Sequence, residues 1–436
     1  MSHHPNERSH LLQQAAWYVQ PRPLFVGSND IRLLRGGDAL FPAMIDQIER
    51  AEREVWLATY IVHNDAAVQA LTAALARAVR RGVQVHVVAD GFGSLHTVSS
   101  TLAHWAAAGV AVAVYRPVRG WWNWLKPGHL RRLHMKLCVV DGQVGFVGGV
   151  NLIDDRIDLR HGRSEQPRLD YSVQVSGPVV APIEQTTRAM WTRAQVGRDW
   201  RDELAELMRG PGRLVRARGL MRQLRMGLAQ DRREAFTEAA HAQAPMRAAF
   251  VVRDNLRQRR TIERSYIDAI ARARQRIDLV SPYFYPGHAF RRALRKAARR
   301  GVQVRLLLQG KIDYRFAAMA ARVLYGELLG AGVRIFEYTP AFLHAKVAIV
   351  DDSWATVGSS NIDPLSLLVN LEANVIVRDS GFVAELAGEL DVDFAASSEV
   401  PATQAGGSTW AVRVRRGLVA WAANLYLRIA GINGRY

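Results

Sequence analysis

Cysteine and lysine are scarce in this 436-residue chain, and it has no long apolar run. The one cysteine, Cys138, can form neither an internal disulfide nor a cysteine-rich zinc site, so disulfide scaffolds and zinc fingers are excluded. No apolar run reaches the roughly 18 to 20 residues that a membrane-spanning helix needs. Because residues 1–20 lack a basic region followed by an apolar stretch, we expect a soluble or peripheral protein on the cytoplasmic side.

Acidic residues are outnumbered: 58 Lys plus Arg stand against 40 Asp plus Glu, which gives a net charge of +18. Such a chain is expected to bind polyanions, but charge alone does not separate nucleic acid from an anionic lipid surface. The hydrophobic content of 49% and the charged content of 22% lie near globular averages. A disordered, collagen-like or coiled-coil chain is therefore excluded.

The chain repeats itself once. The hexapeptide Arg-Arg-Gly-Val-Gln-Val occurs at residues 80–85 and again at residues 299–304. Each copy ends a stretch with helical periodicity and leads into an alternating apolar run that is typical of a strand. The predicted helices are 45–53, 66–81, 262–275 and 288–300, and the predicted strands are 55–62, 83–89, 277–283 and 302–308. We therefore predict an α/β protein with two similar halves.

The repeat divides the chain into segments. We predict one domain over residues 27–198 and a second over residues 240–398. Residues 1–26 carry no periodic signal. Residues 199–239 are rich in arginine and are predicted to form a linker or an amphipathic helix, and residues 399–436 end in a candidate amphipathic helix.

Both halves carry the same polar pattern, His-x-Lys-x4-Asp, followed by a glycine-rich turn that contains Asn. The first copy consists of His134, Lys136, Asp141 and Asn151, and the second of His344, Lys346, Asp351 and Asn361. Side chains two apart on a strand point to one face, so each His and Lys should project into the same site. Asp170 and Glu372 precede later apolar strands, where each could orient an imidazole. Histidines satisfied within the core are the alternative, but the duplication of the whole pattern argues against it.

These motifs resemble the signature of the phospholipase D superfamily, His-x-Lys-x4-Asp-x6-Gly-Gly/Ser-x-Asn. Residues 354–366 and 370–374 look specifically like bacterial cardiolipin synthases, and the absence of amino-terminal spanning helices is similar to the B type. The resemblance implies two tandem phospholipase D-like domains, each a mixed β-sheet flanked by helices, related by a pseudo-twofold axis with the active site at their interface. Gly149, where the second copy has Ser359, is a departure that removes a hydroxyl.

The resemblance also implies substitution at a phosphodiester through a phosphohistidine. His134 would be the nucleophile and His344 the acid and then the base, with the reverse assignment left open. Lys136, Lys346, Asn151, Asn361 and Ser359 would hold the phosphate oxygens. Asp170 and Glu372 would fix the imidazole tautomers, while Asp141 and Asp351 belong to the catalytic motifs and are expected to stabilise their strands and turns. No cofactor is expected, and without a carboxylate cluster at ligand spacing we predict metal independence.

For the reaction, the resemblance implies transfer of a phosphatidyl group between two phosphatidylglycerol molecules to make cardiolipin. Hydrolysis, or transfer from phosphatidylethanolamine or to another alcohol, stays open, because the motifs activate phosphate and leave the choice of acceptor to the pocket. Candidate pocket residues are Tyr60, His63, Tyr283 and Tyr285. A nuclease is the alternative of a different class, and a basic scaffold without activity is the non-enzyme alternative.

Three segments combine aromatic or apolar residues with basic ones. They are the loop with Trp121, Trp122 and Trp124, the stretch 214–228, and the terminal helix with Trp421. Packing into the fold or base stacking also fits each of them, but together they favour an anionic phospholipid membrane. We therefore expect phosphatidylglycerol and this membrane as partners, no nucleic acid, and a peripheral position on the cytoplasmic face of the bacterial inner membrane. The sequence leaves the oligomeric state open.

Overall fold

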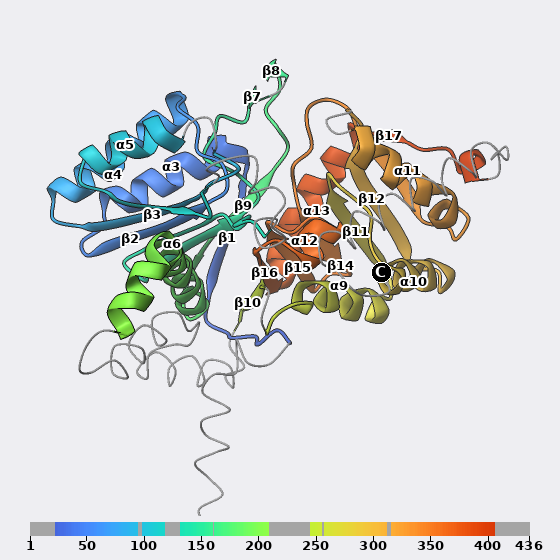
Figure 1. Cartoon of the computed structure of the whole chain (residues 1–436). Coiled ribbons are helices and arrows are strands. Elements are labelled where there is room, and N and C mark those ends of the chain that lie inside the picture. Colours follow the sequence, from blue (N-terminus) through green and yellow to red (C-terminus); the bar gives the residue numbers. More distant parts are fainter. Residues whose placement is uncertain are drawn as a thin grey trace, which may run out of the picture.

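The computed structural model describes residues 22–94, 98–117, 131–159, 161–208, 245–254, 257–311 and 315–405, apart from a few side chains within helices. Two mixed β-sheets lie side by side in this part of the chain, and helices flank each of them (Figure 1). Each sheet belongs to one half of the sequence, which confirms the predicted α/β class and the two similar halves. The membrane-contact candidates Trp121, Trp122, Trp124 and Trp421 and the stretch 214–228 lie outside the described residues.

The first sheet has seven strands in the order β1-β9-β6-β5-β2-β3-β4. Strands β2, β3 and β4 are parallel to one another, and the remaining pairs are antiparallel. The bounds are β1 (Asp30–Arg35), β2 (Glu54–Thr59), β3 (Gln84–Asp90), β4 (Ala111–Tyr115), β5 (Leu137–Val140), β6 (Val144–Gly148) and β9 (Tyr171–Ser176). A separate small hairpin joins β7 (Ile157–Asp158) to β8 (Gly162–Arg163).

The second sheet repeats this order and adds one edge strand, giving β10-β16-β15-β14-β11-β12-β13-β17. The bounds are β10 (Arg247–Arg253), β11 (Arg276–Ser281), β12 (Gln303–Gln309), β13 (Arg334–Tyr338), β14 (Val347–Val350), β15 (Trp354–Gly358), β16 (Glu372–Arg378) and β17 (Ser398–Glu399). The matching strand orders mean that each functional residue of one half has a counterpart in the other.

Helices α3 (Gly36–Glu49), α4 (Ala66–Arg80) and α5 (Val98–Ala107) cover one face of the first sheet, and α6 (Val180–Met208) covers the other (Figure 1). Helices α9 (Thr261–Arg272), α10 (His288–Arg299) and α11 (Arg315–Leu329) belong to the second half, with α12 (Pro364–Leu368), α13 (Ser380–Ala395) and η3 (Ala402–Ala405). No helix among the described residues is both long enough and apolar enough to cross a membrane.

Two predicted boundaries differ most from the structure. Helix α3 begins at Gly36, nine residues before the predicted start, because the distant carboxylate of Asp155 accepts the N–H of Gly37 and supports its first turn. Local sequence, with two glycines and Pro42 in this stretch, contains no sign of that contact. Helix α6 continues to Met208 and so passes the predicted domain end at residue 198.

The interface between the halves is a hydrophobic core in its own right. One cluster of buried residues takes members from both sheets, among them Val147, Val173, Val357 and Val375, and from helices α6 and α13. Burial of this shared apolar surface fixes the two sheets relative to each other.

Candidate active site

The two motif segments are extended and run into β5 and β14. His134 and Lys136 lie just before β5, and His344 and Lys346 just before β14, rather than within the strands as predicted. Between them, Met135 and Ala345 are fully buried and anchor each segment. The Nζ atom of Lys136 donates to the carbonyl oxygen of His134 over 2.7 Å, and Lys346 makes the matching bond to His344.

Each histidine is held by the opposite half of the chain. Nδ1 of His134 lies 3.0 Å from Oε2 of Glu372, and Nδ1 of His344 lies 2.6 Å from Oδ2 of Asp170. The backbone repeats the exchange, since the N–H of His134 donates to Leu371 O and that of His344 to Leu169 O, over 3.0 and 2.8 Å. The two carboxylates are almost fully buried. Both imidazoles are thus fixed at Nδ1, and Nε2 is left for chemistry.

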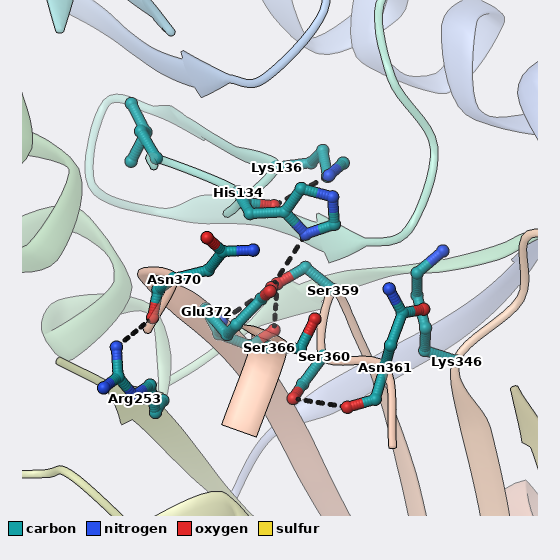
Figure 2. Close-up of polar contacts among 12 residues, drawn as sticks. His134, Lys136, Arg253, Lys346, Ser359, Ser360, Asn361, Ser366, Asn370 and Glu372 are labelled. Carbon is teal, nitrogen blue, oxygen red and sulfur yellow. Dashed lines mark hydrogen bonds and ion pairs between the residues drawn. The ribbon is translucent and has the colours of Figure 1, made fainter. Parts of the chain in front are cut away.

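The two carboxylates differ in their surroundings. The Ser359 hydroxyl donates to Oε2 of Glu372 over 2.5 Å, the same oxygen that faces His134 (Figure 2). In the first half the equivalent position is Gly149, where a Cβ atom would collide with the Asp170 carboxylate. Ser359 therefore serves a carboxylate rather than pointing to an open phosphate position, which differs from the role expected for it.

Burial shifts the pKa values of the lysines strongly. It lowers the pKa of Lys136 to about 7 and that of Lys346 to about 8, although carboxylates of the site oppose the shift. The charge of Lys346 adds to the fall in the pKa of Lys136, and the charge of Arg168 adds to the fall in the pKa of Lys346. An anionic ligand would restore both positive charges by supplying the missing counter-charge.

The pKa values of both histidines fall, whereas those of the two carboxylates move in opposite directions. Burial lowers the pKa of His134, and it lowers that of His344 well below the ordinary value, with Lys346 adding to the effect. Burial raises the pKa of Asp170 to about 7. Burial would also raise the pKa of Glu372, but His134, Lys136 and Ser359 outweigh it and hold the pKa below its usual range. Both free imidazoles are neutral near pH 7, so each Nε2 has a lone pair available.

The two asparagines of the motifs lie in the same region. Asn151 and Asn361 are nearly buried, and each sits at the end of the turn that follows β6 or β15. Oδ1 of Asn151 accepts the N–H of Ile61, which turns its amide nitrogen away from that contact. Oδ1 of Asn361 and Oε1 of Glu372 have no hydrogen-bond partner among the described residues. The lysines and histidines act on one another through their charges, and Asn151 is joined to Ile61, the neighbour of Tyr60.

Asp141 and Asp351 stand at the far ends of β5 and β14 from the histidines. The Asp141 carboxylate accepts the N–H groups of Glu52, Arg53 and Glu54. The Asp351 carboxylate accepts those of Arg274, Gln275 and Arg276 in the same manner. Both aspartates have a positive φ, 53° and 52°. Their observed contacts join a turn to the start of β2 or β11.

Sequence reasoning missed two residues that position the histidine segments. Asp90 is fully buried at the end of β3, and its Oδ2 accepts the N–H of Leu133 over 2.9 Å. Gln309 ends β12, and its Oε1 accepts the N–H of Leu343 over 2.7 Å. Each residue ends the strand that follows the repeated hexapeptide, so comparison of the two copies would have found the pair.

The candidate pocket residues differ in what they contact. The Tyr60 ring is 4.9 Å from the His134 ring, and Nζ of Lys136 lies 5.4 Å from the centre of the tyrosine ring. His63 contacts Asp65, with Nδ1 3.1 Å from Oδ2. The backbone N–H of Tyr285 donates to Ile362, next to Asn361. In the described part of the chain, no three His, Cys, Asp or Glu side chains are grouped so that they could hold a metal ion.

Such a set of groups suits chemistry at a phosphate ester. One neutral imidazole can attack phosphorus while a second transfers a proton to or from an alkoxide. The lysines and amides can hold the non-bridging oxygens and stabilise the charge that grows in the transition state. Because each carboxylate comes from the other half, the site is complete only when both halves are packed together.

A family model and several relatives that match this chain are all described as cardiolipin synthases. The family model described as "Cardiolipin synthase, PLD-like domain" matches residues 44–162 and 266–395. Cardiolipin synthase B of Salmonella typhi is 38% identical over 356 residues, which are 81% of this chain and 78% of that protein. Cardiolipin synthase B of Escherichia coli K12 is 36% identical over 385 residues, 88% of this chain and 84% of that protein.

More distant proteins share the fold. Cardiolipin synthase A of Pseudomonas fluorescens is 32% identical over 375 residues, 86% of this chain and 70% of that protein. The crystal structure of phosphatidylserine synthase from Haemophilus influenzae superposes with a TM-score of 0.62, covering 97% of this chain and 99% of that one. At 12% identity, that structure shows the architecture alone.

Proposed function

This chain belongs to the cardiolipin synthases, a family with phospholipase D-like domains, and from that premise we propose that it transfers a phosphatidyl group from one phosphatidylglycerol to a second and releases glycerol. The observation that carries the proposal is the reciprocal pairing of His134 with Glu372 and His344 with Asp170. Two imidazoles oriented in this way supply a nucleophile and a proton carrier for one phosphorus.

In the first half-reaction, Nε2 of His134 forms a bond to phosphorus and the bond from phosphorus to the glycerol oxygen breaks. His344 gives that oxygen its proton, and free glycerol leaves. His344 is neutral before the substrate binds, and the negative phosphodiester raises its pKa toward the protonated form. Lys136 and Lys346, which flank the histidines, hold the non-bridging oxygens throughout.

In the second half-reaction, a hydroxyl of another phosphatidylglycerol gives its proton to His344 and attacks phosphorus. The bond between phosphorus and His134 breaks, which yields cardiolipin and the free imidazole. The same site would hydrolyse the intermediate if water took the place of the alcohol. His134 is only 9% exposed. A site that shields its reacting groups from water favours attack by the alcohol over hydrolysis.

The proposal includes a location. A lipid substrate and a net charge of +18 support a peripheral position on the cytoplasmic face of the bacterial cell membrane. Fractionation of cells tests this part: the protein should sediment with membranes and leave them in high salt. Retention in the cytosolic fraction at low salt would contradict it.

The reaction is tested by mass spectrometry of lipids after incubation of the purified protein with phosphatidylglycerol vesicles. Cardiolipin with free glycerol is expected from the wild type and from His104→Ala, a surface control, but not from His134→Ala or His344→Ala. Phosphatidic acid without cardiolipin would make the enzyme a phospholipase. Cleavage of DNA without any lipid product would replace the proposal by a nuclease.

A further inference from the structure

The duplication of the fold allows surface charges on equivalent helices to be compared. Helix α4 of the first half corresponds to α10 of the second, because both end at the repeated hexapeptide. The second arginine of each hexapeptide makes equivalent hydrogen bonds. Nη2 of Arg81 donates to Ile48 O and Ala51 O, and Nη2 of Arg300 donates to Ile270 O and Ala273 O. Because the acceptors are equivalent, these bonds also show which residue of α3 corresponds to which residue of α9.

In the first half, the basic residues of this surface have an acidic partner. Glu49 accepts from Nε of Arg77 over 2.7 Å and from Nη1 of Arg81 over 3.3 Å. The residue at the position of Glu49 in the second half follows Ile270 and is Ala271, which is exposed. Lys296, the counterpart of Arg77, therefore has no carboxylate beside it. The second half has lost the counter-charge that the first half kept.

Helix α10 carries exposed cations on one face, and one of them has no basic counterpart in α4. Arg292, Lys296 and Arg299 are exposed along one face of α10, and we call them the α10 stripe. Their side chains make no hydrogen bond or ion pair within the described part of the chain. Glu327, an acidic residue that contacts α10, forms its ion pairs with Arg291 and Arg295 instead. In α4, the position of Arg292 is occupied by Ala73.

The fold itself does not account for the α10 stripe. Like charges four residues apart, such as Arg292 and Lys296, destabilise a helix. The helix dipole favours Arg299 in the last turn, as it favours Arg80 in α4, but it gives no such support to Arg292 in the second turn. Neighbouring α9 adds exposed Arg264 and Arg272, with Asp268 as its exposed acidic residue. Unpaired cations kept at such a cost to the helix indicate an external polyanion.

We propose that the α10 stripe is a docking surface for the anionic headgroups of a phospholipid bilayer. The choice of lipid over nucleic acid rests on the proposed function, since the substrate lies in an anionic membrane. Figure 1 shows α9 and α10 side by side on the second half, so the exposed cations of both helices belong to one packed helix pair. The first turn of α10 lies close to the candidate active site, because α10 begins three residues after Tyr285. The backbone N–H of Tyr285 donates to the carbonyl oxygen of Ile362, which follows Asn361. A bilayer held there is adjacent to the reacting groups at one end.

Sedimentation with vesicles tests the α10 stripe directly. The full chain is mixed with vesicles of pure phosphatidylcholine or with mixed vesicles that contain about 30% phosphatidylglycerol, at the same salt concentration in both cases. Each cation near an anionic surface contributes about fivefold to binding, so Arg292→Gln with Lys296→Gln and Arg299→Gln should weaken binding to the mixed vesicles on the order of 100-fold. Neither protein should bind well to phosphatidylcholine alone.

A matched control removes the same charge elsewhere. Arg50→Gln with Arg80→Gln and Arg163→Gln changes three exposed arginines of the first half and should bind almost as the wild type does. A second variant, Ala271→Glu, restores to Lys296 the acidic neighbour that Arg77 has, and should weaken binding about fivefold. This single exposed change keeps the test valid if the triple variant folds poorly.

The outcomes separate the two proposals. Binding of the stripe variant at the wild-type level would overturn the docking surface, and so would an equal loss in the matched control. Loss of binding to a DNA duplex, with binding to the mixed vesicles intact, would replace the lipid by nucleic acid. The rate with short-chain phosphatidylglycerol dissolved below its micelle threshold should not change in the stripe variant. Absence of cardiolipin from every substrate would defeat the proposed reaction but leave the vesicle result standing.

Discussion

The carboxylate of Glu372 lies 3.0 Å from Nδ1 of His134, although the two residues belong to different halves of the chain. Asp170 makes the reciprocal contact with His344 at 2.6 Å. Neither half contains both a histidine and the carboxylate that orients it. The histidine–carboxylate pairs therefore exist only at the interface, and each half needs the other to orient its imidazole.

Replacement of either carboxylate by its amide should lower kcat sharply. An amide in place of Glu372 can offer its own N–H to Nδ1 of His134 and so stabilise the wrong imidazole tautomer. A loss of about 10³-fold to 10⁴-fold is expected for Glu372→Gln, and a loss of the same order for Asp170→Asn. Steady-state rates with circular dichroism and thermal melts check the result. Glu385→Gln, on the surface of α13, is the control. Wild-type kcat in both amide variants would remove the carboxylates from the mechanism.

Ser359→Ala should move the acidic side of the pH profile. The Ser359 hydroxyl, with His134 and Lys136, holds the pKa of Glu372 below its ordinary value against the effect of burial. Loss of the hydroxyl raises that pKa, so Glu372 takes up a proton at higher pH and stops supporting His134. The acidic limb of kcat/KM should therefore shift to higher pH. Ser360→Ala, one residue away, should leave the limb in place. An unchanged limb in Ser359→Ala would show that another group sets it.

Local sequence was enough to predict the strands and helices around the hexapeptides and both polar motifs. These signals depend on neighbours within a few residues, as in α10, whose predicted and observed starts are both His288. The start of α3 could not be predicted, because Asp155 reaches Gly37 from a distant loop. The pairing of each histidine with the opposite half was equally hidden, since an alternating strand pattern does not say which sheet faces it.

Asp141→Asn should destabilise the fold and leave the chemistry nearly intact. Three backbone N–H groups outweigh the burial of Asp141 and hold its pKa below the ordinary value. A carboxylate whose pKa is lower in the folded state stabilises the fold above its unfolded pKa, and that contribution is lost as the pH falls through the folded pKa. With its partial exposure taken into account, the variant should lose about 1 to 2 kcal/mol of unfolding free energy. Denaturant melts at neutral and acidic pH measure the loss, which should shrink in acid.

The matched control for this variant is Asp352→Asn, because Asp352 is an exposed neighbour of the equivalent Asp351 but does not accept the turn N–H groups that Asp351 accepts. Its melting curve should match the wild type. A large fall in kcat for Asp141→Asn with an unchanged melt would contradict the structural role and place Asp141 in the chemistry.

Direct titration of the lysines should give two unusual values. Burial lowers the pKa of Lys136 to about 7 and that of Lys346 to about 8 in the free enzyme. The chain has only five lysines, so carbon-13 labelling of the side chains gives an NMR spectrum simple enough to follow each one. Lys136→Gln and Lys346→Gln assign the two resonances, and Lys296 is an exposed reference.

The pKa values of the two lysines also give the direction in which activity should change with pH. Above its pKa each buried lysine is neutral and no longer attracts a phosphate anion, so kcat/KM, which reports on the free enzyme, should fall as the pH rises past about 7 to 8. A bound phosphodiester supplies the counter-charge and raises both pKa values, so kcat should persist to higher pH than kcat/KM does. Lysine resonances that titrate only near the ordinary value would mean that water reaches both ammonium groups, and the basic limb would then need another cause.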